Sequence, residues 1–108
     1  MGTLLWTAPE VLKGRPSTEG ADVYAFGVVL WEILHWSEPY VGKSSFQVAM
    51  DVAKGGRPAV DGAALDGLYG GGKGGMGRLM EDTWAEEPLA RPSFVEILQR
   101  LDGLEDEE

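Results

Sequence analysis

One apolar segment constrains this chain of 108 residues more than any other part of it. Between Ala21 and Leu34 the only polar residues are Asp22 and Glu32. A segment of about 14 residues is longer than a usual strand, so we expect a helix here rather than a buried strand. A helix that is apolar on nearly all sides runs through the middle of a core. We therefore expect the rest of the chain to pack around this segment.

Two other segments carry helix start signals. Ser44 and Gln47 have the spacing of a capping box, and a partial apolar stripe follows them as far as Gly55. Ser93 and Glu96 form a second box, after which residues 94, 97, 98 and 101 are apolar at helical spacing. Both segments are therefore predicted to be amphipathic helices that begin at their serines.

A glycine-rich stretch divides the chain, since ten of its 16 glycines lie between Gly55 and Gly77. We expect a loop over residues 55–75, because each glycine adds backbone entropy and no side chain that can pack. Residues 67–74 nearly spell a phosphate-binding P-loop, but Gly74 replaces the required Ser or Thr and no apolar strand precedes them. A short helix is predicted over residues 76–84. No segment alternates like a strand, so the predicted fold is all-α, with four to five helices around the central one.

The composition is that of one small globular domain, with 44% hydrophobic and 25% charged residues. The net charge is −9, and residues 81–108 carry ten acidic and two basic residues, or −8 of that total. Binding to nucleic acid or to an anionic membrane is therefore not expected. With neither a span of ~20 apolar residues nor a signal peptide, we expect a cytoplasmic protein or the cytoplasmic part of a larger protein. Residues 104–108 are predicted to be a solvated acidic tail.

The residue types leave little room for catalytic or metal chemistry. The chain has no cysteine and a single histidine, His35, which rules out a thiol nucleophile and a zinc site built from cysteines or several histidines. We predict that His35 lies near a helix C-terminus. The tryptophans are predicted to pack in the core, since no basic residues interleave with them; they are Trp6, Trp31, Trp36 and Trp84. No catalytic residue and no metal ligand is assigned.

Five motifs resemble one known family. Residues 2–10 read Gly-Thr-Leu-Leu-Trp-Thr-Ala-Pro-Glu, and residues 22–27 read Asp-Val-Tyr-Ala-Phe-Gly. Three shorter motifs follow in order: Pro-Tyr-x-Gly, Gly-Arg-Pro and Trp-x-x-x-Pro-x-x-Arg-Pro-Ser-Phe. This succession resembles the lower part of the C-terminal lobe of protein kinases, from the end of the activation segment to the last helix. The resemblance covers residues 2–101 and implies a partial kinase domain over residues 1–103.

Two functions are compatible with this resemblance. Gly-Thr at residues 2–3 resembles Ser/Thr kinases, whereas residues 6–10 and 84–94 resemble tyrosine kinases. That mixture is typical of the tyrosine-kinase-like group, which mostly phosphorylates Ser and Thr, and it implies a fragment of an ATP-dependent kinase that acts on protein substrates. Residues 4–10 also resemble the kinase-homology domain of membrane guanylyl cyclases. The alternative is therefore a non-catalytic, pseudokinase-like regulatory or interaction module.

The resemblance also implies roles for particular residues. Gly2, Thr3 and Trp6 would shape the pocket for the substrate residue that follows the phospho-acceptor. Glu10 and Arg91 would form a buried ion pair, although they are 81 positions apart. Kinases use ATP and magnesium, but the family's phosphate loop, strand lysine, catalytic Asp and magnesium Asp are missing from this chain. We therefore expect the isolated chain to bind no nucleotide and to be inactive.

The central segment would have two further roles by the same resemblance. Asp22 would anchor this helix to the catalytic loop, and without that loop we expect its side chain to face solvent or a gap. The packing face toward the rest of the lobe would be formed by Tyr24, Phe26, Val29 and Ile33. Some of these apolar residues are therefore expected to be exposed here.

Overall fold

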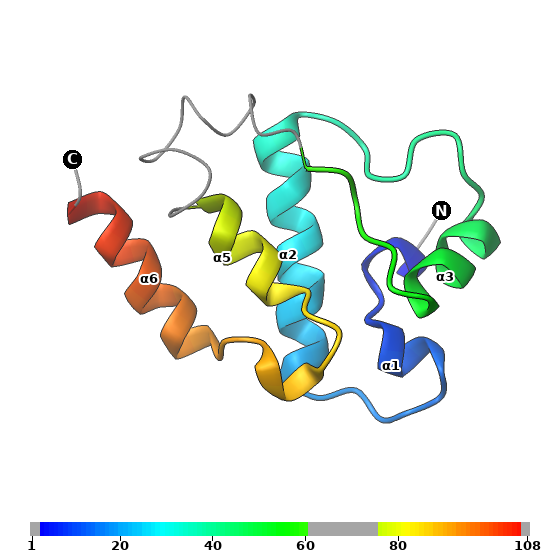
Figure 1. Ribbon diagram of the computed structural model, residues 1–108, viewed down its shortest axis with the longest axis horizontal. Helices are drawn as coiled ribbons and strands as arrows, with labels where there is room; N and C mark the ends of the chain where they lie inside the picture. The colour runs from blue at the N-terminus through cyan, green and yellow to red at the C-terminus, as the bar shows by residue number, and fades with distance from the viewer. Residues whose placement is uncertain (1–2, 61–75, 107–108) are drawn as a thin grey trace.

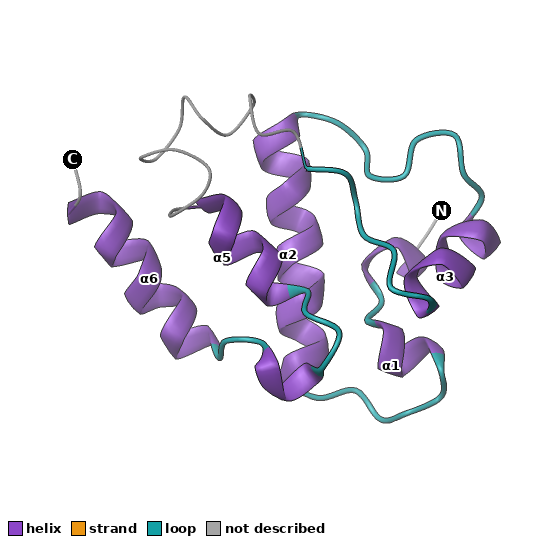
Figure 2. Cartoon of the chain, viewed as in Figure 1, coloured by secondary structure: helices purple, strands orange, loops and turns teal. Residues whose placement is uncertain are grey.

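The computed structural model describes residues 3–60 and 76–106, with the backbone alone described for residues 3, 4 and 104–106. The elements are the short 3-10 helices η1 (Thr3–Trp6) and η2 (Pro88–Ala90) and the α-helices α1 (Pro9–Leu12), α2 (Glu19–His35), α3 (Ser45–Ala53), α5 (Met76–Thr83) and α6 (Phe94–Asp106). Within the described ranges no residue is in a strand (Figure 2). The all-α prediction is confirmed, and the helical architecture agrees with a kinase C-lobe fragment.

Helix α2 stands at the centre of the molecule. Helices α5 and α6 lie on one side of it, and α1 and α3 lie on the other (Figure 1). Helix α5 packs against α2 and α6, whereas η1 packs against both α2 and α3. The core contains Ala21, Val23, Tyr24, Val28, Leu30, Trp31 and Leu34 of α2, together with Val48, Val52, Met76, Leu79, Met80 and Ile97 of the surrounding helices. The predicted central position of the apolar segment is therefore confirmed.

One face of α2 remains uncovered, which confirms the prediction that some apolar residues of this helix are exposed. The side chains of Val29 and Ile33 are 42% and 63% exposed, and Asp22 on the same face is exposed as well. Phe26 is half-buried, because its ring packs edge-on against Phe94 of α6 at 6.1 Å. Tyr24, by contrast, is completely buried. The described neighbours of α2 thus cover part of its circumference and leave an apolar stripe open.

A glycine sets the distance between α2 and α5. A Cβ atom added at Gly27 would lie 1.9 Å from Oγ1 of Thr83, far inside van der Waals contact. That hydroxyl is itself held in place, because it donates a hydrogen bond to the Met80 carbonyl at 2.5 Å. The two helices can approach this closely only because residue 27 has no side chain.

The two predicted capping boxes form to different extents. At α3, the Ser44 hydroxyl accepts a bond from the Gln47 amide at 3.1 Å, but the Gln47 side chain donates to Asp51 instead of reaching back. At α6, both halves of the box are present. Ser93 accepts from the Glu96 amide at 3.1 Å, and Glu96 accepts from the Ser93 amide at 2.8 Å. An acidic partner four residues on explains why Gln47 turns away.

The C-terminal helices agree largely with their sequence patterns. Met76, Leu79 and Met80 of α5 are buried as predicted. Helix α6 continues as far as Asp106, so three residues of the predicted acidic tail have helical backbone. The predicted loop begins after α3, and the P-loop-like residues 67–74 lie outside the described residues.

The tryptophan prediction is wrong at one position. Trp31 and Trp84 are 7% and 6% exposed and Trp6 is half-buried, but Trp36 is 94% exposed. Trp36 follows the last turn of α2 in the left-handed conformation, at φ 50° and ψ 44°, and this cap turns the chain away from the core. His35, as predicted, lies at the C-terminus of α2, where its ring stacks on Trp31 with centroids 4.3 Å apart.

Candidate functional site

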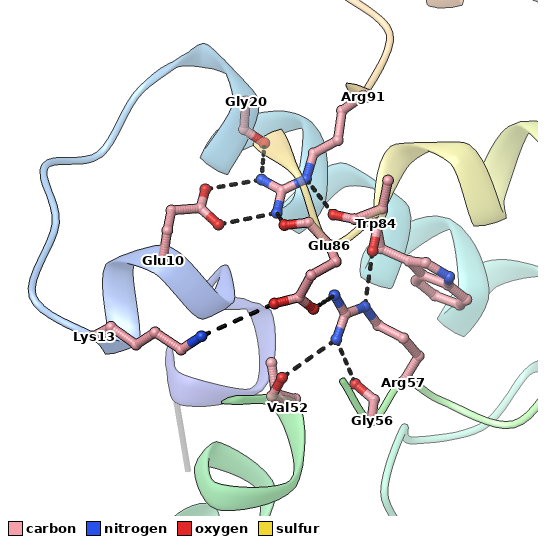
Figure 3. Close-up of polar contacts among 10 residues, drawn as sticks. Glu10, Lys13, Gly20, Val52, Gly56, Arg57, Trp84, Glu86 and Arg91 are labelled. Carbon is pink, nitrogen blue, oxygen red and sulfur yellow. Dashed lines mark hydrogen bonds and ion pairs between the residues drawn. The ribbon is translucent and has the colours of Figure 1, made fainter. Parts of the chain in front are cut away.

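The structure brings Glu10 and Arg91 into direct contact. Nη1 of Arg91 donates to Oε2 of Glu10 at 2.8 Å, and Nη2 donates to Oε1 at 2.9 Å (Figure 3). The Arg91 side chain is 0% exposed and that of Glu10 is 9% exposed. The contact is thus a bidentate ion pair inside the protein, the geometry that a planar guanidinium and a carboxylate make best.

Two prolines help to aim these side chains at each other. Pro9 begins α1, and Glu10 is therefore held in the first turn of that helix. Pro92 disfavours a helical conformation for the residue before it, and Arg91 is extended, with φ −78° and ψ 144°. Arg91 therefore lies just after η2 and before α6, from which its side chain reaches α1.

Arg91 also bonds to three backbone carbonyls. Nη1 donates to Gly20 at 2.9 Å, Nε donates to Ala85 at 2.8 Å, and Nη2 lies 3.5 Å from the carbonyl of Glu86. These bonds join the start of α2 and the turn after α5 to the ion pair. They also satisfy the remaining donors of a buried cation, which is what makes its burial tolerable.

The pair changes the titration of its carboxylate. Burial alone would raise the pKa of Glu10, since a charge is disfavoured away from water. Two kinds of interaction outweigh burial: hydrogen bonds from Arg91 and from the backbone, and the positive charges of Arg91 and Arg57. Together they lower the pKa of Glu10 below its ordinary value of 4.5. Glu10 is therefore an ionised partner at neutral pH and not a proton donor.

A second arginine, Arg57, organises the neighbouring turn. Its Nε donates to the Trp84 carbonyl at 2.8 Å, and Nη1 donates to the carbonyls of Gly56 at 2.7 Å and Val52 at 3.4 Å. Nη2 donates to Oε1 of Glu86 at 3.1 Å (Figure 3). Arg57 therefore fastens the end of α3 to the turn after α5. No local pattern in the sequence predicts this role, since Arg57 stands there only as part of the Gly-Arg-Pro motif.

Tyr24 lies close to both arginines. The guanidinium carbons of Arg57 and Arg91 are 5.1 and 5.2 Å from the centre of its ring. Burial raises the pKa of Tyr24 above its ordinary value of 10.0. The central helix thus offers a buried aromatic face to both guanidinium groups. Arg57 and Arg91 each precede a proline, but Arg15 does so as well, so this local pattern by itself could not have suggested the pairing.

The predicted substrate-binding residues are only partly described. Gly2 lies outside the described residues, and for Thr3 the structure describes the backbone alone. Trp6 is half-buried in η1, where its indole Nε1 donates to Oε1 of Glu32 at 2.9 Å. This bond fixes Trp6 to α2. Asp22, the predicted anchor, lies in the first turn of α2 with an exposed side chain.

Among residues 3–60 and 76–106, no three His, Asp or Glu side chains are grouped so that they could hold a metal ion. No helix in these ranges is both long and apolar enough to cross a membrane.

Comparison with known proteins gives the family. Residues 2–101 match the family described as "Protein tyrosine and serine/threonine kinase". The chain is 41% identical over 105 residues to "Probable serine/threonine-protein kinase drkC" of Dictyostelium discoideum, matching 96% of this chain and 13% of that protein.

Two further relatives are similar over nearly the whole chain. "Dual specificity protein kinase shkC" of Dictyostelium discoideum is 42% identical over 104 residues, or 94% of this chain and 19% of that protein. Human "Mitogen-activated protein kinase kinase kinase 11" is 40% identical over 104 residues, or 96% of this chain and 12% of that protein. The chain thus spans less than a fifth of the length of these relatives. With the family matched over residues 2–101, the chain belongs to the protein kinase family.

Proposed function

We propose that this chain is one part of the catalytic domain of an ATP-dependent protein kinase that transfers phosphate to Ser and Thr of protein substrates. The observation that carries the proposal is 41% identity over 96% of the chain to a relative named as a serine/threonine-protein kinase. We assign the chain to the tyrosine-kinase-like group because its motifs combine residues typical of Ser/Thr kinases with residues typical of tyrosine kinases. A cytoplasmic location belongs to the same proposal.

We place the binding of ATP and magnesium outside the described residues. Phosphoryl transfer needs donors that cradle the phosphates and carboxylates that hold Mg²⁺. The described residues contain no cluster of acidic side chains suited to a metal ion. Under this proposal the described residues supply support and substrate contacts, and the reacting groups lie elsewhere in the protein.

On the substrate side, Gly2, Thr3 and Trp6 would shape the pocket for the residue after the phospho-acceptor. Support comes from the way Trp6 is held, since its indole bonds to Glu32 on the central helix at 2.9 Å. An aromatic side chain fixed to the central helix is suited to positioning a peptide, because little of its freedom remains to be lost on binding.

The test uses the full-length protein that contains this chain, with radioactive ATP and a mixed protein substrate. We expect phosphate on Ser and Thr. Trp6→Ala should raise KM for a peptide substrate at least about fivefold and change kcat less, since it removes binding contacts and not reacting groups. Trp36→Ala is the matched control, because Trp36 is 94% exposed and outside η1.

A folded full-length protein that transfers no phosphate would contradict the proposal. That result would favour the alternative, a non-catalytic module like the kinase-homology domain of guanylyl cyclases. Calorimetry on the isolated chain adds a second check, with no saturable Mg-ATP binding expected at millimolar ATP. Binding there would direct attention back to residues 67–74.

A further inference from the structure

A surface cleft of about 560 Å³ lies where the start of α2, η2 and the start of α6 come together. In Figure 1 these segments meet at the lower end of α2. The Glu10–Arg91 pair lines the cleft, together with the loop that leads from α1 to α2. Its volume is within the range of about 300–1,000 Å³ that is usual for ligand-binding clefts.

The walls of this cleft are largely apolar. Pro16, Pro88, Leu89 and Pro92 line it, and Val23 of α2 contributes from the core side. Leu89 is 93% exposed, so nearly its whole side chain is available for a contact. A single exposed leucine is common on protein surfaces, but one at a cleft between prolines offers a place for another aliphatic side chain.

The charged side chains of the cleft are mostly acidic. The charges of Glu10 and Arg91 cancel in their ion pair, which leaves Glu19, Glu87 and Glu96 against a single cation, Arg15.

Two of these carboxylates are held in place by backbone bonds. Glu19 accepts from the Phe94 amide at 3.2 Å, and Glu96 accepts from the Ser93 amide at 2.8 Å. Glu87 is exposed. The cleft therefore has an apolar wall beside a field that attracts cations.

We propose that this cleft docks a linear segment of a partner protein in which one aliphatic side chain is flanked by Lys or Arg. The aliphatic group would pack against Leu89 and the prolines, while the flanking cations would lie near Glu87 and the two other carboxylates. The charge complementarity selects this occupant over a second copy, since each copy of the chain carries a net charge of −9. The docking site is separate from phosphoryl transfer, so it can fail or hold independently of the proposed kinase function.

The test measures the fluorescence anisotropy of a labelled Gly-Lys-Arg-Leu-Arg-Lys-Gly peptide titrated with the full chain at about 50 mM salt, where exposed charges act over more than ~10 Å. Leu89→Ser should weaken binding at least about fivefold, as expected when a leucine contact is lost. Glu87→Gln should weaken it about twofold and reduce its salt dependence. Near-UV circular dichroism shows that each variant has kept its fold, which the exposure of both residues favours.

Matched controls separate docking from general attraction to an acidic chain. Leu98→Ser, at a leucine 64% exposed on α6, and Glu81→Gln, at an exposed glutamate of α5, lie outside the cleft and should not change binding. A peptide with Ser in place of its Leu should bind at least about fivefold more weakly. Equal binding of the two peptides, equal loss in the control variants, or no binding at millimolar chain would overturn the proposal. Self-association in sedimentation experiments that Leu89→Ser abolishes would assign the cleft to a second copy instead.

Discussion

The guanidinium of Arg91 makes more contacts than any other single group at the site. It holds the Glu10 carboxylate with two bonds, bonds to three carbonyls, and lies over the ring of Tyr24. Because the side chain is fully buried, each of these groups would lose its partner at once if Arg91 were removed. The contribution of the pair is therefore seen mainly when one member is deleted.

We predict that Arg91→Ala destabilises the protein by about 3–5 kcal/mol, because it leaves the Glu10 carboxylate buried without a partner. Arg91→Lys should recover only part of that loss, since an ammonium cannot make two parallel bonds. Glu10→Gln combined with Arg91→Met should also recover part, because no buried charge remains. Urea unfolding followed by near-UV circular dichroism gives the order of stability of these variants and the wild type. An Ala variant as stable as the wild type would show that the pair has no structural role.

The same carboxylate predicts a pH dependence. The pKa of Glu10 is lower in the folded protein than in the unfolded chain. Its contribution to folding stability is therefore complete above the unfolded pKa of 4.5 and is lost as the pH falls through the lower folded pKa. The urea midpoint should therefore fall as the pH drops below about 5, and Glu10→Gln should make that fall shallower.

The control for this pH prediction is Asp51→Asn. The hydrogen bonds from Lys43 and Gln47 lower the pKa of Asp51 in the same direction, but this carboxylate lies at the surface. Asp51→Asn should change the fall of the urea midpoint at acid pH much less than Glu10→Gln does. If the urea midpoint falls equally at acid pH in Glu10→Gln and in the wild type, the loss of stability is due to other groups.

At the scale of elements, the helices agree with local signals, and their separation depends on single residues. Helix α2 lies close to α5 because Gly27 presents no side chain to Thr83. Apolar periodicity predicts that both helices exist and which face of α5 is buried. It does not predict the distance between them, because that distance depends on which two residues meet.

We predict that Gly27→Ala costs at least about 2 kcal/mol of stability, because its Cβ would overlap the Thr83 hydroxyl. Gly103→Ala is the matched control, since Gly103 lies in α6 with nothing within 4 Å of an added Cβ. That change should stabilise the protein by up to about 1 kcal/mol through helix propensity. Thr83→Ala should partly rescue Gly27→Ala. Thermal unfolding compares the four variants, and equal effects of the two glycine changes would refute the close contact.

At the scale of the whole molecule, the open face of α2 is the largest departure from a closed domain. Val29 and Ile33 are exposed on the helix that otherwise forms the centre of the core. Under the kinase proposal this face packs against the rest of the lobe, and the isolated chain should therefore have marginal stability.

We predict that the double change Val29→Ser and Ile33→Ser affects the isolated chain and the full-length protein differently. In the isolated chain it should lower the binding of a hydrophobic dye and change stability by no more than about 0.5 kcal/mol. In the full-length protein it should cost about 3 kcal/mol or more, because two apolar side chains would lose their burial. Val95→Ser with Leu98→Ser is the control, at residues of α6 that are 65% and 64% exposed. Equal effects of both double changes in the full-length protein would contradict the packing of α2.

Local patterns along the chain determined much of this protein. The apolar run, the Ser93–Glu96 capping box and the spacing of Met76, Leu79 and Met80 were enough to predict the helices, because capping and helical periodicity act over three or four residues. The motif wording identified the family and suggested that Glu10 and Arg91 would meet.

Only the tertiary structure decided how distant segments share their side chains. Three features involve segments that have no common local pattern: the contact of Tyr24 with both Arg57 and Arg91, the exposure of Trp36, and the cleft beside Leu89. Each depends on the position and rotation of whole helices, which are set by close contacts such as that of Gly27 with Thr83. Such contacts result from packing in three dimensions, and no periodicity along the chain encodes them.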